Sequence, residues 1–315
     1  MRSCSSDPLS TIVTRRTAII AAAASAFARS APAAGASTEL REIAPGIFVR
    51  RGADTEATRA NAAAIGNAGF VIGRDAVCVT DPGGSMADGA ALRSAIRART
   101  DRPITHVVLG HGHPDHVFGA AAFVRDGPAI VGHHRLAASL ASRGDYDRQR
   151  LSALIGAEAA GPWTLPNAIV RDQLTVDLGM RRLTFTAHSP AHTRCDLSLI
   201  DDATGILFAG DLLFVERIPS LDGSLTGWIA VLDRFNATRV IPGHGPVLVD
   251  RAPAVAKLRA YLVMLRDQTR AAIARGVPID VAARTLGQSA RANWRLFDAY
   301  HPGNVIKAYK ELEWE

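Results

Sequence analysis

The feature that most constrains this chain is the hexapeptide HGHPDH, which begins at His111 and directly follows the apolar run PITHVVLG. A continuous apolar run of this length is typical of a strand that is buried on both faces of a sheet. In an extended segment the side chains of His111 and His113 point to the same side, so both imidazoles can reach one ion. Pro114 then ends the extension and starts a helix, which directs Asp115 and His116 elsewhere. Neutral imidazoles and a carboxylate predict a zinc site, with iron or manganese as chemically reasonable substitutes.

Three later residues supply the ligands that one hexapeptide lacks. His192 lies in SPAHTRCD, Asp211 ends ILFAGD, and His244 lies in VIPGHGP. Each follows an apolar run at a junction of strand and loop, where sites in α/β sheets are usually found. A catalytic metal takes about three protein ligands and keeps an open position. The set is therefore large enough for two ions, and the glycines of PGHG allow the backbone a close approach.

Strands and helices are mixed along the whole chain. Two strands are expected within 40–52 and two more within 61–84, followed by a helix from Met86. Further helices are expected over 117–126, up to about 154, and over 225–235, 255–275 and 279–315; further strands are expected over 129–132, between 168 and 211, and over 239–241. This order predicts an α/β sandwich with its helices outside.

The order of the motifs resembles the metallo-β-lactamase superfamily, whose H-x-H-x-D-H signature is present at residues 111–116. The resemblance implies an αβ/βα sandwich of two mixed β-sheets flanked by helices, spanning 37–315, with a mostly helical extension from about 252. It also implies a ligand arrangement with Asp211 bridging two zinc ions. One ion would be held by His111, His113 and His192, and the other by Asp115, His116 and His244.

The chemistry implied is hydrolysis of an ester, thioester, lactone or amide-type bond of a small molecule by a hydroxide that bridges the metals. Asp115 would act as the catalytic carboxylate that orients the water and carries a proton. The resemblance also places the loop at Asp81 beneath the metals, where this carboxylate would orient a ligand histidine; a plain turn cap is the competing interpretation. His106, His133, His134, His188 and His301 match no ligand position.

A bridging Asp211 departs from true β-lactamases and is similar to glyoxalase II and lactonases. The segment RIPSLDGSLTGWIAVLDRF resembles exported zinc metallohydrolases associated with quinoprotein relay systems, a resemblance that implies no substrate. The wall of the substrate pocket is expected within this segment, at Ile218, Asp222 and Trp228. Three alternatives remain: a β-lactamase, a mononuclear iron dioxygenase that oxidises sulfur, and a non-enzymatic metal-binding partner of a periplasmic redox system.

The amino-terminal residues 1–36 are typical of an export signal. The pair Arg15 and Arg16 precedes a short apolar stretch and small residues, as in twin-arginine signals; a general secretory signal is the alternative. No segment is long enough to span a membrane, so we expect a periplasmic or secreted protein. Half of the formal net charge of +6 comes from this segment, and the remaining basic residues are scattered, which disfavours nucleic-acid binding. Cys78 and Cys195 cannot be assigned to a disulfide from sequence.

Overall fold

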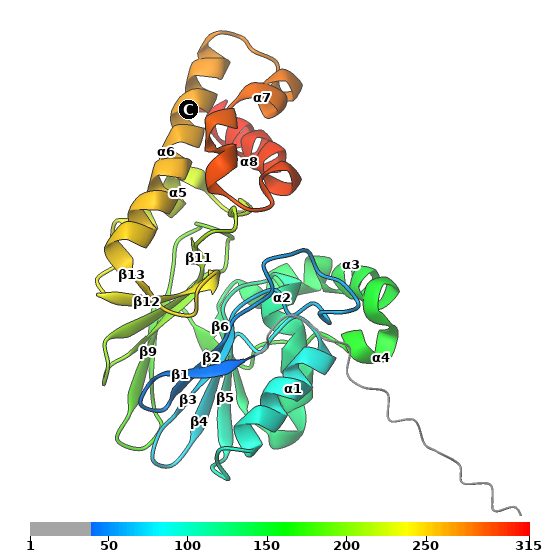
Figure 1. Ribbon diagram of the computed structural model, residues 1–315, viewed down its shortest axis with the longest axis vertical. Helices are drawn as coiled ribbons and strands as arrows, with labels where there is room; N and C mark the ends of the chain where they lie inside the picture. Colours follow the sequence, from blue (N-terminus) through cyan, green and yellow to red (C-terminus); the bar gives the residue numbers. More distant parts are fainter. Residues whose placement is uncertain (1–38) are drawn as a thin grey trace, which may run out of the picture. The chain divides into compact units, whose positions relative to one another are not determined.

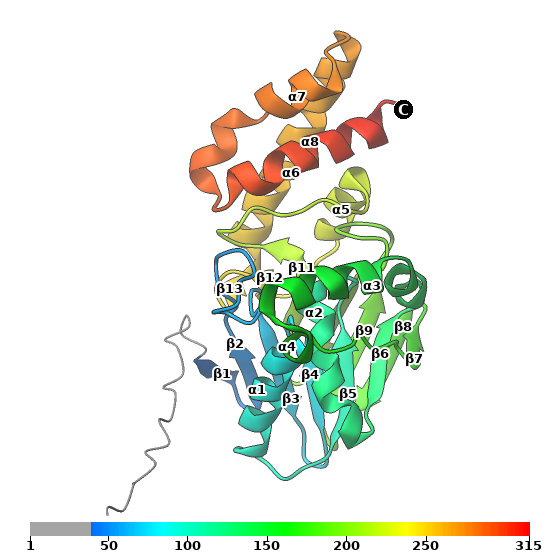
Figure 2. The same ribbon diagram turned by 90° about the vertical axis from the view of Figure 1, so that its right-hand side faces the viewer.

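The computed structural model describes residues 39–315, which form one compact unit (Figures 1 and 2). Two mixed β-sheets face one another, and helices cover the outer face of each. The predicted αβ/βα sandwich is thereby confirmed. The export signal predicted for 1–36 lies outside the described residues.

The amino-terminal sheet has seven strands in sequential order. The first four strands pair antiparallel, and the pairs from β4 to β7 are parallel. The strands are β1 (Leu40–Ala44), β2 (Ile47–Arg50), β3 (Ala68–Ile72), β4 (Val77–Thr80), β5 (Ile104–Leu109), β6 (Ala129–His133) and β7 (Ala168–Val170). β5 is the apolar run before HGHPDH, and its residues face alternate sides: Val107 packs under the outer helices and Val108 between the sheets. The prediction of a strand buried on both faces is confirmed.

The second sheet has six strands in the order β13-β12-β11-β10-β9-β8. Only the β11–β12 pair in it is parallel. The strands are β8 (Gln173–Asp177), β9 (Arg182–Ala187), β10 (Leu197–Asp201), β11 (Ile206–Phe214), β12 (Arg239–His244) and β13 (Val249–Asp250). Phe185 and Phe208 of this sheet meet Val71 and Val131 of the other in the core between the sheets.

Helices α1 (Met86–Arg97), α2 (Pro114–Val117), α3 (Leu136–Ile155) and α4 (Ala157–Ala160) lie beside the amino-terminal sheet. The helix expected over 117–126 is present but is mostly of the 3-10 type: α2 makes one turn, and 118–126 continue as the 3-10 helix η1 (Phe118–Asp126). One reason is that Gly119 donates its N–H to the carbonyl of Gly83 in a neighbouring loop, not to a residue of its own helix.

The carboxyl-terminal helices α5 (Leu225–Leu232), α6 (Arg251–Ala274) and α8 (Phe297–Leu312) share one hydrophobic core with β11. The predicted helical tail is broken into α7 (Ile279–Thr285), the 3-10 helix η2 (Gln288–Asn293) and α8. Gly287 and Leu296 adopt left-handed backbone conformations at the two breaks, with φ of +64° and +58°. No helix within 39–315 has the length and apolar character needed to cross a membrane.

Candidate metal centre

The structure brings together all seven residues that the sequence singled out as ligands. His111 and His113 follow β5, and Asp115 and His116 lie in α2. His192 follows β9, Asp211 lies within β11, and His244 ends β12. The ligand atoms form two groups, within each of which all atoms lie within 4.8 Å of one another: His111, His113, His192 and Asp211 in one, and Asp115, His116 and His244 in the other.

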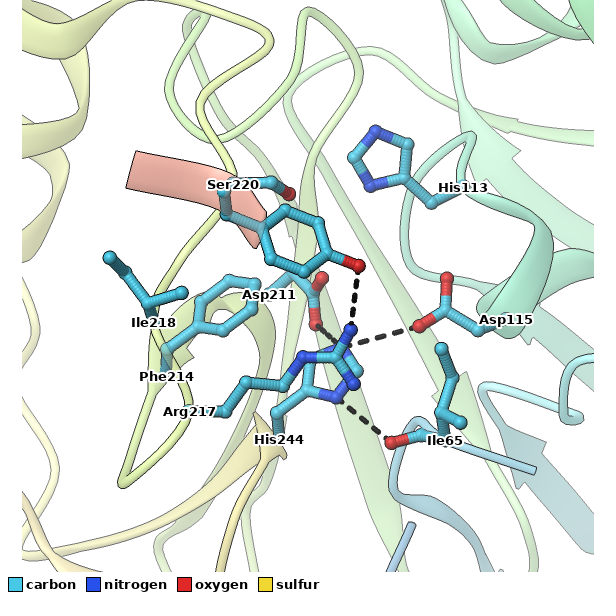
Figure 3. Close-up of a pocket in the computed structure, with 10 residues that line it drawn as sticks. Ile65, His113, Asp115, Asp211, Phe214, Arg217, Ile218, Ser220 and His244 are labelled. Carbon is cyan, nitrogen blue, oxygen red and sulfur yellow. Dashed lines mark hydrogen bonds and ion pairs between the residues drawn. The ribbon is translucent and has the colours of Figure 1, made fainter. Parts of the chain in front are cut away.

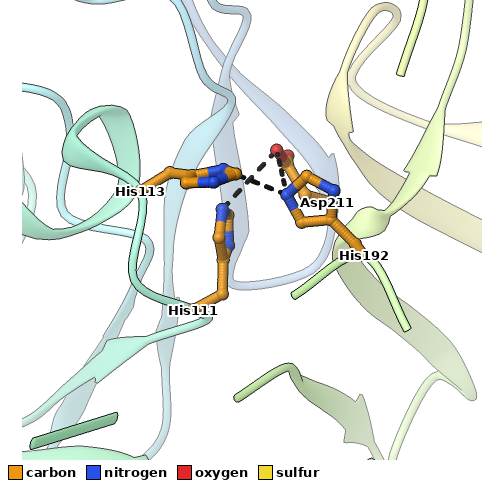
Figure 4. Close-up of side chains that lie close together, drawn as sticks. All are labelled: His111, His113, His192 and Asp211. Atoms are coloured by element: carbon orange, nitrogen blue, oxygen red, sulfur yellow. Dashed lines mark hydrogen bonds and ion pairs between the residues drawn. The ribbon is translucent and has the colours of Figure 1, made fainter. Parts of the chain in front are cut away.

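In the first group three imidazoles converge on one carboxylate oxygen (Figure 4). His192 Nε2 lies 3.3 Å and His111 Nε2 3.6 Å from Oδ2 of Asp211. His192 Nε2 also lies 3.1 Å from Nδ1 of His113. As predicted, the side chains of His111 and His113 point toward the same group of ligand atoms.

In the second group the other oxygen of the same carboxylate faces two further imidazoles. Oδ1 of Asp211 lies 3.1 Å from His116 Nε2 and 3.4 Å from His244 Nε2. Oδ2 of Asp115 lies 3.4 Å and 3.2 Å from the same two nitrogens. Asp211 therefore stands between the two groups and offers one oxygen to each.

The outer ring nitrogens of His113, His192 and His244 have hydrogen-bond partners among the described residues. His192 Nδ1 faces the carbonyl of Ser220 at 2.7 Å, and His244 Nδ1 faces the carbonyl of Ile65 at 2.9 Å. Since a carbonyl only accepts, these nitrogens must donate, which leaves each Nε2 with a lone pair toward the centre.

Asp81 and Asp222 lie behind the rings of His116 and His113. Oδ2 of Asp81 lies 3.4 Å from Nδ1 of His116, and its Oδ1 accepts the N–H of Gly110 at 2.9 Å. Oδ2 of Asp222 lies 2.8 Å from Nε2 of His113. Asp81 thus lies close to His116, but Nδ1 of His116 has no hydrogen-bond partner among the described residues, so the orienting role of Asp81 stays a prediction.

The donor set fits metal ions. His111 Nε2, His116 Nε2 and Asp211 Oδ1 are buried and have no hydrogen-bond partner among the described residues, which is costly unless a ligand completes them. Burial lowers the pKa of His192 to about 3, so its imidazole is neutral and able to ligate. Burial also opposes the charge of Asp211, but the facing imidazoles hold the pKa of this carboxyl well below its usual range. Nitrogen and oxygen donors without a thiolate suit zinc, iron or manganese.

Glycines allow the cluster to be this dense. A Cβ on Gly243 would collide with Oδ1 of Asp211, and a Cβ on Gly66 would lie 2.8 Å from the ring of His116. The close approach expected at PGHG is therefore required, while the sequence offered no signal for Gly66.

An inner cavity and an outer cleft, which share four lining residues, lie at the two ligand groups. An inner cavity of about 60 Å³ is lined by residues of both groups and by Ile65, Phe214, Arg217, Ile218, Ser220 and Tyr300 (Figure 3). An outer cleft of about 330 Å³ shares His113, Asp115, Ser220 and Tyr300 with it and adds Arg143, Asp222 and Lys307. Two of the three expected pocket residues, Ile218 and Asp222, thus line the inner cavity and the outer cleft respectively.

Trp228, the third expected pocket residue, lines neither hollow. Its side chain is fully buried in α5, its ring centroid is 5.1 Å from that of His192, and its Nε1 donates to the carbonyl of Leu212. The indole ring packs against the ring of His192 because Trp228 lies on the buried side of α5.

Sequence reasoning missed Tyr300 and did not name Arg217 or Ser220, although it expected the pocket wall in their segment. Arg217 and Ser220 lie in the loop between β11 and α5, and Tyr300 comes from α8, 56 residues after the last ligand, His244. No local motif marks them; the sole signal is the spacing of Tyr300, Gly303 and Lys307, which places them on one face of a helix.

The remaining histidines and cysteines lie outside the ligand groups. His188 Nε2 pairs with Ser198 Oγ at 2.8 Å, and His301 Nδ1 with the hydroxyl of Tyr261 at 2.9 Å. Cys78 and Cys195 are buried free thiols.

Comparison with known proteins agrees with this geometry. The family model described as metallo-beta-lactamase superfamily matches residues 62–244, which include all seven residues of the centre. The chain is 24% identical over 233 residues to a linear primary-alkylsulfatase from Pseudomonas sp., covering 61% of this chain and 43% of that protein. It is 29% identical over 182 residues to an acyl-coenzyme A thioesterase from Homo sapiens, covering 51% and 61%. The chain thus spans about half the length of the curated relatives it matches.

Solved structures share the fold at low identity. A metallo-beta-lactamase from Pontibacter korlensis superposes with a TM-score of 0.58 at 19% identity, covering 71% of this chain and 98% of that one. A stereoselective inverting sec-alkylsulfatase from Pseudomonas sp. superposes with a TM-score of 0.62 at 17% identity, covering 87% and 50%. The sulfatase match covers more of this chain than the lactamase match does.

Proposed function

Because the chain belongs to the metallo-beta-lactamase superfamily, we propose that it is a hydrolase that uses two metal ions, zinc in the first place. The substrate would be a small molecule with an ester, thioester, lactone or amide-type bond. One observation supports the dinuclear form above all: the two oxygens of Asp211 face two separate groups of ligand atoms.

His111, His113 and His192 would hold one ion, Asp115, His116 and His244 the other, and Asp211 would contact both. Two such ions supply an activated water and polarise the bond to be cleaved. The chain's own contribution begins with Asp115, which lines both the inner cavity and the outer cleft. Its carboxylate is placed to orient a nucleophile and to pass a proton to the leaving group.

The alternatives have less support. A mononuclear iron dioxygenase would not require the complete second group of Asp115, His116 and His244. A non-enzymatic metal carrier would not require two hollows that reach both groups. β-Lactam cleavage remains less favoured because of the carboxylate at Asp211.

We place the mature protein in the periplasm or outside the cell, where an association with a redox system would occur. The support is the arginine pair before an apolar stretch in residues 1–36, together with the resemblance to exported metallohydrolases.

The test of the dinuclear hydrolase is metal analysis combined with the variant Asp211→Ala. Wild-type protein should hold two ions per chain and hydrolyse at least one member of a panel of thioester, lactone, sulfate-ester and β-lactam compounds. Asp211→Ala removes the negative charge between two dications, so at least one ion should be lost and hydrolysis strongly reduced.

His188→Ala is the matched control, because His188 lies four residues from His192 but contacts Ser198 instead of the centre. It should keep two ions. Saturation of the wild type at one ion, or two tightly held ions in Asp211→Ala, would contradict the assignment.

A further inference from the structure

Arg217 is a buried cation inside the inner cavity. Only 4% of this residue is exposed, yet it lines the cavity together with His113, Asp115, Asp211 and His244. Figure 3 shows its side chain reaching into the cavity from the side of Phe214 toward the side of Asp115. A buried guanidinium is costly unless its charge and its donors are satisfied.

The described residues satisfy Arg217 only in part. Its Nη1 donates to the carbonyl of Thr55 at 3.1 Å and its Nη2 to the hydroxyl of Tyr300 at 3.0 Å. A guanidinium has five N–H donors, so others remain for a ligand. The nearest carboxylate is that of Glu56, 4.0 Å away on a side chain that is 54% exposed, and it compensates the charge weakly.

Two elements fix the guanidinium in this position. The backbone N–H of Ile218, next to Arg217, donates to the carbonyl of Arg295, and the N–H of Arg295 donates to the carbonyl of Glu216. Tyr300 holds the tip of the side chain from α8, and its ring lies 5.4 Å from the Arg217 Cζ. The donors are thus oriented before any ligand arrives, which favours tight binding.

The balance of charge in the cavity points to an anion. Two divalent ions would more than neutralise Asp115 and Asp211, and Arg217 adds another positive charge beside them. In the outer cleft the charges are matched, because Lys307 pairs with Asp222 at 3.1 Å and Arg143 pairs with Asp147 at 2.8 Å. The surplus positive charge therefore lies at the inner cavity, with the two ions and Arg217.

Size narrows the ligand further. The inner cavity of about 60 Å³ is lined by residues of both ligand groups and would also hold the ions, so only the reacting group of a substrate can enter it. The body of a larger molecule would occupy the outer cleft of about 330 Å³.

We propose that Arg217 binds an oxyanion of the substrate, either a sulfate ester at the reacting bond or a carboxylate directly beside it. Tyr300 positions the guanidinium: its hydroxyl accepts from Arg217 and donates to Glu56. This inference rests on the proposed hydrolase and narrows its substrates to anionic ones. Arg217 is then the residue that selects charged over neutral substrates.

The experiment measures binding as well as turnover. Inorganic sulfate is titrated by calorimetry into metal-loaded wild type, Arg217→Gln, Arg217→Lys and Arg259→Gln, with metal content and melting temperature determined for each. Arg259 is the matched control, because it makes an exposed ion pair with Asp233 on the outer side of α6. We expect Arg217→Gln to bind sulfate at least about tenfold more weakly, Arg217→Lys to be intermediate, and Arg259→Gln to equal wild type.

Turnover then separates the two sources of the anion. 4-Nitrophenyl sulfate, mono-4-nitrophenyl succinate and neutral 4-nitrophenyl butyrate are compared by kcat/KM. Arg217→Gln should lose at least about tenfold more in kcat/KM on whichever anionic compound is cleaved than on the neutral ester.

Equal sulfate binding by wild type and Arg217→Gln at equal metal content would overturn the proposal, as would an equal loss on charged and neutral esters. If Arg217→Gln fails to fold, Arg217→Lys replaces it, and weaker sulfate binding than wild type at equal metal content is then the criterion. Absence of any hydrolysis by the metal-loaded wild type, with sulfate binding still dependent on Arg217, would instead contradict the proposed hydrolase and support the oxyanion site.

Discussion

At the scale of single residues, Asp222 connects a ligand to both walls of the cleft. It accepts from His113 and forms ion pairs with Lys307 of α8 and Arg143 of α3. The hydrogen bond from His113 holds the pKa of Asp222 below its usual range, so the carboxylate stays charged. A charged acceptor behind an imidazole fixes its orientation and raises its basicity as a ligand.

We therefore expect Asp222→Asn to weaken the binding of the metal ion held by His113 by about tenfold and to leave the affinity for the other ion unchanged. Competition with a chelator, followed by elemental analysis, measures the two affinities separately. Asp202→Asn, on an exposed carboxylate near Arg182, is the control. Equal weakening of both ions would show that the change acts on the fold instead of on His113.

His188 predicts how stability depends on pH. Burial, with contributions from His133 and Arg234, lowers its pKa to about 4, against about 6.5 in an unfolded chain. Above pH 6.5 both states are neutral at this ring. Between pH 6.5 and 4 the unfolded state binds the proton and the folded state does not, so the free energy of unfolding falls as the pH falls.

The loss due to His188 should reach about 1–3 kcal/mol at pH 4. Denaturant unfolding of metal-free wild type and His188→Gln across this range measures it, and the variant should show the shallower decline. Parallel curves for the two proteins would contradict the prediction.

The sequence identified all seven residues of the two groups because each lies in a short local motif, although Asp211 lies within β11 and not at a junction of strand and loop as expected. It did not predict Arg217, Tyr300 or the pairing of Asp222 with His113. These depend on contacts between residues that are far apart in the sequence: 83 positions separate Arg217 from Tyr300, and 109 positions separate His113 from Asp222. No local spacing encodes such contacts. The sequence predicted Trp228 in the pocket wall because its segment could be identified, but the side of α5 on which Trp228 lies could not.

At the scale of elements, α1 is held to the sheet by a buried ion pair. Arg50 at the end of β2 contacts Asp88 in the first turn of α1, and their side chains are only 6% and 3% exposed. Asp88 also accepts the N–H of Gly84 at 3.0 Å. Removing one partner leaves the other charge buried and uncompensated.

We expect Asp88→Ala to lower the free energy of unfolding by about 3–5 kcal/mol. Urea denaturation measures this, with Asp75→Asn, on an exposed pair with Arg74, as the control that should change little. A loss for Asp88→Ala no greater than that of the control would mean that the pair does not stabilise α1.

Element types were largely predictable, whereas some ends were not. Periodicity identified β5, α1 and α6, because each buries one regular stripe or run. It could not show that η1 tightens to a 3-10 helix against Gly83 or that the tail bends at Gly287 and Leu296. In both places contacts distant in sequence override the local helical preference.

At the scale of the whole molecule, the predicted destination is itself testable. Replacing Arg15 and Arg16 by Lys should retain the precursor in the cytoplasm, because the twin-arginine route depends on the pair. Cell fractionation and immunoblotting measure the distribution, and Arg29→Lys is the control within the same segment. Unchanged export of the double variant would favour the general secretory route.

The carboxyl-terminal helices are built into the cleft instead of being appended to it. Asn304 of α8 holds the β11–α5 loop by accepting from Leu221 N and donating to the carbonyl of Pro219. Glu311 of the same helix accepts from the first backbone N–H groups of α5. Tyr300 and Lys307 complete the wall between these contacts.

The ligand groups and the wall of the cleft come from different parts of the chain. The family match ends at His244 and includes all seven residues of the two ligand groups, while α8 follows it and contributes Tyr300, Gly303 and Lys307 to the lining of the outer cleft. Lys307 is coupled to the ligands, because it pairs with Asp222, which contacts His113. Tyr300 and Gly303 belong to neither ligand group, so we expect substitutions at these two positions to change which molecules fit the cleft while both groups of ligand atoms stay intact.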